Sequence, residues 1–207
     1  MMSSPFTFLL IGLTALLSWQ GFNNRRLVDR MILWPPAIER HRQYDRLLTY
    51  GFIHADWAHL IFNMITLFFF GRLIEQFMTE VSGSILTFPL FYLAALAVSI
   101  LPTYLKNRGN PNYLSLGASG AVSAVLFAFI LLSPWSLIFV LFIPAPAIVY
   151  AVFYVGYSIW MDKKGGDNIN HSAHLAGAAF GVLFMLCMRP DILGHFLAAL
   201  ANPRFGP

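Results

Sequence analysis

Long apolar segments constrain this chain more than any other feature of its sequence. Several of them approach or reach the roughly 20 residues that a helix needs to cross the hydrocarbon core of a bilayer. Hydrophobic residues make up 58% of the 207 residues and charged residues only 11%, whereas soluble domains carry about 25% charged residues. We therefore predict an all-α integral membrane protein that forms a single domain over residues 1–207.

Six apolar segments are predicted to cross the membrane as helices. They cover residues 5–22, 58–77, 84–105, 118–132, 145–160 and 172–188. No Lys or Arg precedes the first segment, and no small-x-small cleavage site follows it, so we interpret it as a retained helix rather than a signal peptide.

The segments between these spans differ in character. Residues 23–57 mix arginines with large apolar side chains, which predicts short helices lying in the membrane interface. Pro134, Pro144 and Pro146 interrupt the apolar run before the fifth span, so we expect residues 134–143 to form a connector at the membrane face. The tail DILGHFLAALANP predicts one more short interfacial helix.

Polar residues inside membrane segments are costly and by default mark a site. In the second span, His59 and Asn63 are four residues apart and therefore share one helix face. In the fourth span, Ser119 lies between small residues in the sequence GASG. In the sixth span, His171 and His174 belong to the sequence HSAHLAGAAFG.

Small residues also predict how the fourth and sixth spans pack. Gly177-x-x-x-Gly181 is a small-x-x-x-small pattern that lets two helices approach closely, and the fourth span carries a matching stripe that begins at Gly120. We predict that these spans meet backbone to backbone. Ser119 would then lie within hydrogen-bond reach of His174.

This set of residues fits acyl transfer. A serine can act as nucleophile when a histidine serves as its base, and the developing oxyanion needs hydrogen-bond donors. We assign Ser119 as nucleophile and His174 as base, with His59, Asn63 and the Ser119 N–H as oxyanion donors. None of the nine acidic residues lies in the middle of the fourth or sixth span, so we predict a dyad rather than a triad.

Each cluster taken alone has a simpler explanation. A serine between glycines in a membrane helix usually serves packing, and a histidine or asparagine can be an interhelical hydrogen-bond partner. Four histidines (His54, His59, His171 and His174) also invite a metal site, although the sequence has no H-E-x-x-H motif and no acidic ligand deep in a span. The combination across three spans favours the enzyme.

Together these motifs resemble the rhomboid family of intramembrane serine proteases. The matching pieces are His59-x-x-x-Asn63, Gly117-Ala118-Ser119-Gly120 and His174-x-x-Gly177-x-x-x-Gly181. The resemblance implies a six-helix bundle with an interfacial first loop and a catalytic dyad of Ser119 and His174. It further implies an oxyanion hole lined by His59 and Asn63, with Gly117, Gly120, Gly177 and Gly181 in supporting positions.

The resemblance also implies a function. Family members cleave transmembrane segments of membrane proteins, and we expect the substrate to enter laterally past the fifth span. The alternative within the same fold is a catalytically silent protein that binds transmembrane clients. We expect transmembrane proteins and the lipid bilayer as partners, and no nucleic acid, cofactor or metal.

Some positions match further family features and others depart from them. Gly71 and Glu75 match a pattern at the end of the second span. Asp45 stands where many members have a tryptophan, and Ser123 stands where many have a tyrosine that packs on the base. We expect Tyr113 or an aromatic residue of the fifth span to hold the histidine instead.

The family resemblance and the positive-inside rule predict opposite orientations in the membrane. The resemblance implies a multi-pass protein of a bacterial-type inner membrane, with the active site opening to the extracytoplasmic side. Loops one, three and five would then lie outside. They hold ten of the 13 basic residues, namely Arg25, Arg26, Arg30, Arg40, Arg42, Arg46, Lys106, Arg108, Lys163 and Lys164. The positive-inside rule predicts the opposite orientation.

Overall fold

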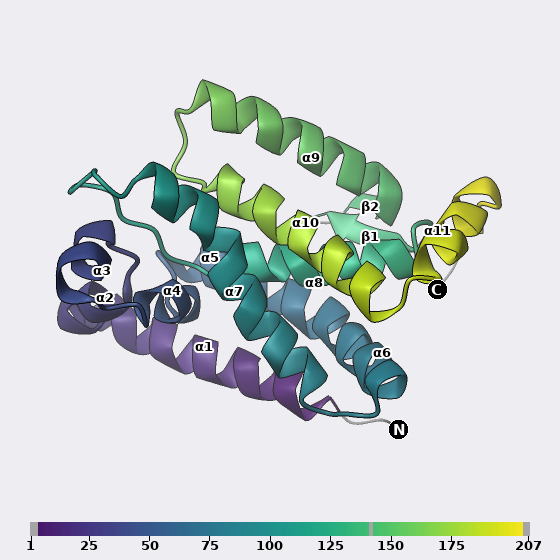
Figure 1. Cartoon of the computed structure of the whole chain (residues 1–207), viewed down its shortest axis with the longest axis horizontal. Helices are drawn as coiled ribbons and strands as arrows, with labels where there is room; N and C mark the ends of the chain where they lie inside the picture. Colours follow the sequence, from purple (N-terminus) through teal and green to yellow (C-terminus); the bar gives the residue numbers. More distant parts are fainter. Residues whose placement is uncertain (1–3, 141–142, 205–207) are drawn as a thin grey trace.

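The apolar segments fold into long helices. In the computed structural model, which describes residues 4–140 and 143–204, four helical segments are long and apolar enough to cross a membrane. They are α1 (Pro5–Asn23), the continuous segment Trp57–Ser82, α7 (Thr87–Lys106) and α10 (His171–Met188) (Figure 1).

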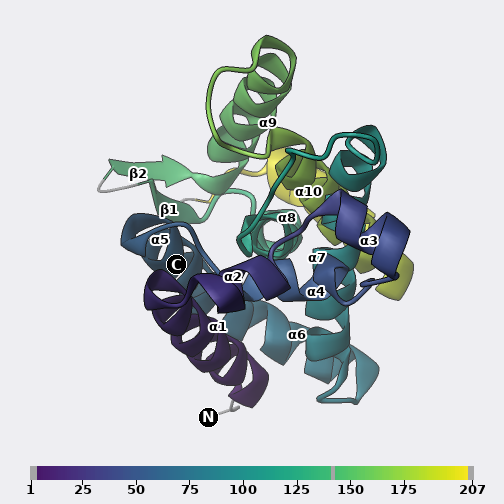
Figure 2. The ribbon, with the colours of Figure 1, turned by 90° about the vertical axis from the view of Figure 1, so that its left-hand side faces the viewer.

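Two further helices occupy the other expected spans. Helix α8 (Ser119–Leu132) has 14 residues, and α9 (Ala147–Lys164) ends in a charged turn. Residues 120–131 of α8 are all buried, because this helix is apolar on every side and lies at the centre of the bundle. Figure 2 shows α8 almost end-on, with other helices around it and α9 leaning away from the rest.

The segment Trp57–Ser82 contains a π-helical turn. Helix α5 (Trp57–Thr66) passes through η2 (Leu67–Gly71) into α6 (Arg72–Ser82). The Glu75 carboxylate accepts hydrogen bonds from the backbone N–H groups of Phe6 and Thr7, at 3.0 and 2.7 Å. It thereby caps the start of α1, where backbone donors have no partner within their own helix.

The first loop contains short helices, as predicted. They are α2 (Arg25–Met31), α3 (Pro35–His41), α4 (Arg46–Thr49) and the 3-10 turn η1 (Tyr50–Phe52). Buried Arg46 donates to the backbone oxygens of Asp29 and Ile32, at 2.9 and 2.7 Å. Asp45, directly before α4, forms an exposed ion pair with Arg30 of α2 at 2.6 Å, so the residue that departs from the family pattern has a partner in the first loop.

The all-α prediction is wrong between the fourth and fifth spans. A β-hairpin forms there, in which β1 (Leu137–Val140) pairs antiparallel with β2 (Ile143–Pro146). Pro144 and Pro146 lack the N–H that a helix interior needs, whereas a two-stranded hairpin tolerates proline on its open edges. Helix α9 therefore begins at Ala147, two residues after the predicted start of the fifth span.

The tail forms the predicted extra helix, α11 (Ile192–Ala201). Residues 141–142 of the expected connector lie outside the described residues. The same holds for residues 1–3 and 205–207 of the expected single domain.

Candidate active site

Ser119 and His174 are brought together from different helices. Ser119 is the first residue of α8, and His174 lies in the first turn of α10. The His174 Nε2 atom is 2.7 Å from the Ser119 Oγ atom, although the residues are 55 positions apart in sequence. This distance is that of a strong hydrogen bond, and it is the contact predicted from the small-residue stripes.

Glycine contacts between α8 and α10 produce this proximity. A Cβ atom on Gly177 would collide with the carbonyl oxygen of Gly120, and one on Gly181 would collide with that of Ala124. The two backbones therefore touch directly, as predicted. These helices make the most extensive contact between any two described elements.

The loop before Ser119 adopts a conformation that requires glycine. Gly117 has φ 116°, and a Cβ atom there would fall on the His59 imidazole. The N–H of Gly117 donates to the carbonyl oxygen of Tyr50 at 2.9 Å, and Ser115 pairs with Leu33 in an isolated β-bridge. The first loop thus fixes the backbone that leads into Ser119.

Asn63 lies buried on α5, on the same face as His59. In this structure its amide donates to the carbonyl oxygen of His59 at 2.8 Å. The backbone N–H of His59 is capped by the Asp56 carboxylate at 2.8 Å, which anchors the start of α5. The two predicted oxyanion donors therefore adjoin each other and the Gly117 loop.

His54 is a site residue whose position the sequence did not predict. Its Nε2 accepts the N–H of Ala118 at 3.3 Å, and its Nδ1 lies 3.0 Å from the Ser18 hydroxyl. Burial, with a smaller contribution from His59, lowers the pKa of His54 to about 3. The imidazole is therefore neutral and binds the residue directly before Ser119.

Asn170 is a second residue that the sequence analysis missed. It caps α10 by accepting the N–H of Ala173 at 3.0 Å, and it also accepts from the Thr103 hydroxyl at 2.8 Å. Its amide donates to Tyr113 and Ser115, at 3.3 and 3.2 Å. An asparagine directly before an apolar helical run is an N-cap signal that could have revealed it.

Of the two groups expected to hold the histidine, an aromatic residue of the fifth span makes the contact. The Tyr154 ring of α9 stacks on the His174 imidazole, with the ring centroids 6.0 Å apart and an interplanar angle of 21°. Tyr113 instead contacts Asn170.

The acidic residues close in sequence to His174 bind other partners. The Asp167 carboxylate lies 3.0 Å from His171 Nε2, and this hydrogen bond is the main cause that lowers the pKa of Asp167. Asp162 accepts from the Ser172 hydroxyl at 2.6 Å. Within residues 4–140 and 143–204, no group of three or more His, Cys, Asp or Glu side chains is placed to hold a metal ion.

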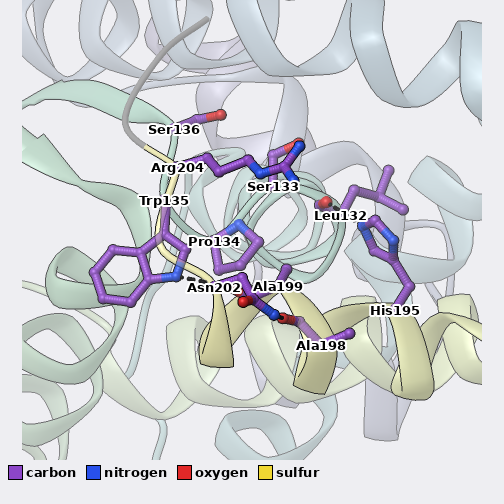
Figure 3. A pocket seen from close by; sticks show the side chains of 10 residues that line it. All are labelled: Leu132, Ser133, Pro134, Trp135, Ser136, His195, Ala198, Ala199, Asn202 and Arg204. Carbon is purple, nitrogen blue, oxygen red and sulfur yellow. Dashed lines mark hydrogen bonds between the residues drawn. The ribbon is translucent and has the colours of Figure 1, made fainter.

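A cavity lies at the opposite end of α8, about 20 Å from Ser119 along the helix. Its walls come from the α8–β1 connection and from α11 (Figure 3). Trp135 donates to the Ala199 carbonyl at 3.0 Å, and His195 lies 2.8 Å from the Leu132 carbonyl, which joins these two walls. None of the predicted site residues lines this cavity.

Known proteins resemble this chain over the region that contains these residues. A family model described as Rhomboid domain matches residues 41–191. RHOMBOID-like protein 12, mitochondrial, from Arabidopsis thaliana is 33% identical, over 80% of this chain and 52% of the relative. Rhomboid-like protein 11, chloroplastic, from the same plant is 27% identical, over 68% and 51%. Rhomboid protein 1, mitochondrial, from Saccharomyces cerevisiae is 29% identical, over 65% and 39%.

The chain spans about half the length, or less, of these relatives. The apolar helices support a membrane protein. The names of these three relatives refer to mitochondria and chloroplasts, so the predicted bacterial inner membrane is not supported.

Proposed function

The chain belongs to the rhomboid family, and we propose that it is an intramembrane serine endopeptidase that cleaves transmembrane segments of membrane proteins. The observation that carries this proposal is the 2.7 Å contact between His174 Nε2 and Ser119 Oγ. It joins a hydroxyl at a helix N-terminus to an imidazole from another helix, which is the arrangement of a nucleophile and its general base.

The reaction follows from these two side chains. Ser119 Oγ attacks the scissile carbonyl carbon while His174 Nε2 takes the hydroxyl proton. The tetrahedral intermediate collapses when His174 returns this proton to the leaving amine, and the acyl group stays on Ser119. A water molecule, deprotonated by His174, then attacks the acyl-enzyme and releases the second product together with free Ser119.

Three donors stabilise the oxyanion in this proposal. The N–H of Ser119 lies in the first turn of α8, where it has no acceptor within its own helix. His59 and Asn63 supply the side-chain donors. Asn63 donates to the His59 carbonyl in the resting structure, so its amide has to turn toward the oxyanion when substrate binds.

The length of α8 supports a site below the membrane surface. Its 14 residues extend about 21 Å, whereas the hydrocarbon core is about 30 Å thick. If α8 begins at the nucleophile and ends near the opposite interface, Ser119 lies inside the apolar layer. We propose that α8 and α9 complete a six-span bundle with the four longer segments.

The proposal is tested by cleavage of a model transmembrane substrate in liposomes, with Ser119→Ala and His174→Ala as variants. We expect wild-type cleavage, and a loss of at least about 1,000-fold in either variant with unchanged thermal unfolding. Labelling of Ser119 by a fluorophosphonate should be lost in the same way. A wild type that neither cleaves nor labels, yet binds transmembrane peptides, would establish the silent client-binding alternative.

The proposed opening of the site to the extracytoplasmic side has a separate test. In a Cys187→Ala background, single cysteines are introduced at position 163, in the last turn of α9, and at position 204, in the tail. We expect a membrane-impermeant thiol reagent to modify the first in intact cells and the second only after permeabilisation. The reverse result would support the orientation that the positive-inside rule predicts.

A further inference from the structure

Tyr154 contacts both helices that carry the proposed dyad. Its ring stacks on the His174 imidazole of α10, with centroids 6.0 Å apart. Its hydroxyl lies 2.6 Å from the Ser123 hydroxyl of α8. One side chain of α9 therefore connects the base with the helix of the nucleophile.

The direction of the hydrogen bonds follows from the donors available. Ser123 Oγ lies 2.7 Å from the backbone carbonyl oxygen of Ser119, which can only accept. Ser123 therefore donates its single hydrogen to Ser119, and it accepts the hydrogen of the Tyr154 hydroxyl. The chain of hydrogen bonds begins on α9 and ends on the residue that carries the nucleophile.

The Tyr154 ring is itself held in place. The ring of Phe127 on α8 and the ring of Tyr150 one turn earlier on α9 both lie with centroids 5.5 Å from it. A ring fixed on two sides and at its hydroxyl is a rigid surface for the imidazole to stack on.

We propose that Tyr154 and Ser123 are positioning residues that together orient the His174 imidazole toward Ser119; this inference rests on the hydrolase function proposed above. A serine–histidine dyad lacks the carboxylate that orients the histidine in a triad, and the carboxylate of Asp167 is bound to His171. Stacking by Tyr154 restricts rotation of the imidazole and keeps Nε2 directed at the hydroxyl. Because Tyr154 belongs to α9, the orientation of the base depends on where α9 lies.

Four variants separate the parts of this arrangement. Tyr154→Leu removes the stacked ring, whereas Tyr154→Phe removes only the hydroxyl, and Ser123→Ala removes the same hydrogen bond from its other end. Phe153→Leu is the matched control, because Phe153 is the neighbouring aromatic residue and is 74% exposed. Each variant is assayed for kcat and KM on a transmembrane substrate, for the rate of Ser119 labelling by a fluorophosphonate, and for its thermal unfolding midpoint.

We expect Tyr154→Leu to lower kcat and the labelling rate together by about tenfold, with KM within about twofold of wild type. Tyr154→Phe and Ser123→Ala should each lower both rates by about two- to threefold. Their double variant should be no worse than either single variant, because both remove one link. Phe153→Leu should leave both rates unchanged.

A transposition distinguishes positioning from a merely structural role. The double variant Ser123→Tyr with Tyr154→Ser moves the phenol ring from α9 to α8 and keeps the summed side-chain volume. We expect it to recover at least about half of the labelling rate lost in Tyr154→Ser alone, when both variants are assayed at a temperature below their unfolding transitions.

Two results would overturn the inference while wild-type activity remains. In the first, Tyr154→Leu labels and cleaves as fast as Phe153→Leu. In the second, the rates fall only in proportion to a lowered unfolding midpoint, and the transposition recovers nothing. A wild type that neither cleaves nor labels would instead refute the hydrolase function itself, and the positioning role with it.

Discussion

Helix α10 meets α8 through backbone atoms, whereas α9 meets α8 through side chains. On the α10 side, Gly177 and Gly181 leave no room for a Cβ atom beside the carbonyl oxygens of α8. On the α9 side, the contact includes the ring of Tyr154, while the buried residues of α9 are Ala147, Ala151, Ser158 and Met161. Figure 1 shows α10 next to α8 and α9 set apart from both.

The difference separates two requirements of a dyad. The distance from the proposed nucleophile to the proposed base is set by a contact between backbones, which cannot adjust without moving a whole helix. The orientation of the base is set by a side chain on a more loosely packed helix. This arrangement fits the expected entry of a substrate past α9, because the α8–α10 spacing would stay constant while α9 moves.

The largest expected effect comes from filling the α8–α10 contact. A Cβ atom in Gly177→Ala or Gly181→Ala would overlap a backbone carbonyl of α8, which can move only if the helix moves. We expect each variant to lower the free energy of unfolding by about 3 kcal/mol. We also expect cleavage to fall by about 100-fold, because a small displacement of reacting groups is costly. Reversible unfolding in detergent and the cleavage assay measure these effects.

A smaller effect than this would contradict the proposed difference between the α8–α10 and α8–α9 contacts. If Gly177→Ala and Gly181→Ala unfold and cleave like wild type, the α8–α10 contact is adjustable and does not set the distance between Ser119 and His174.

The second expected effect concerns His54, which binds the loop that leads into Ser119. His54 is neutral in the fold, with its pKa lowered to about 3, whereas the unfolded chain takes up a proton near pH 6.5. Stability should therefore fall as the pH drops from about 6.5 toward 3, by at most about 1.4 kcal/mol per pH unit from this group. His54→Gln does not titrate and can still accept the Ala118 N–H.

This pH dependence is measured by unfolding in detergent at several values between pH 4 and 7. We expect a flatter dependence in His54→Gln than in wild type. Identical slopes would show that folding does not lower the pKa of His54, and the Gly117 loop would then be less rigid than the α8–α10 contact.

Sequence reasoning succeeded where one physical rule dominates. Apolar length predicted the helices, and the spacing of Gly177 and Gly181 predicted their contact with α8. It failed at residues 137–146, where the prolines suggested a connector and a helix that starts at residue 145, but the pairing of two short strands produces a hairpin. Strand pairing depends on a partner, which no single segment specifies.

Some residues of the candidate site could be predicted from the sequence and others could not. Ser119 and His174 could be predicted because a polar residue in an apolar helix is conspicuous. His54 and Asn170 lie in loops, where polar residues are ordinary, so their hydrogen bonds to Ala118 and Ala173 become evident only in three dimensions. Tyr154 is one of several aromatic residues on α9, and no pattern distinguishes the one that stacks on His174.

The third effect is the cap of α10. Asn170→Ala removes the acceptor for the Ala173 N–H and should cost about 1 kcal/mol of stability. It also loosens the start of the helix that carries His174, so we expect a fall in kcat of about fivefold. Asn170→Asp keeps the cap but loses the donors to Tyr113 and Ser115. An intermediate result for Asn170→Asp would show that the cap and the donors both contribute, whereas a result equal to that of Asn170→Ala would assign the effect to the donors alone.

The smallest expected effect comes from a glycine-to-alanine substitution in α9, the same change that we expect to be most damaging in α10. Gly156 lies in α9, and a Cβ atom there would have no atom within 4 Å. Gly156→Ala therefore adds a methyl group to open space and replaces a poor helix former with the best one, which should stabilise α9 by about 0.5–1 kcal/mol. We expect a slightly higher unfolding midpoint and an unchanged rate of fluorophosphonate labelling. Gly177→Ala makes the same chemical change in α10, where we expect a loss of stability. Any difference between the two variants therefore comes from the packing around the added methyl group. Equal losses in both variants would mean that α9 is held as closely as α10, and the proposed division between distance and orientation would be wrong.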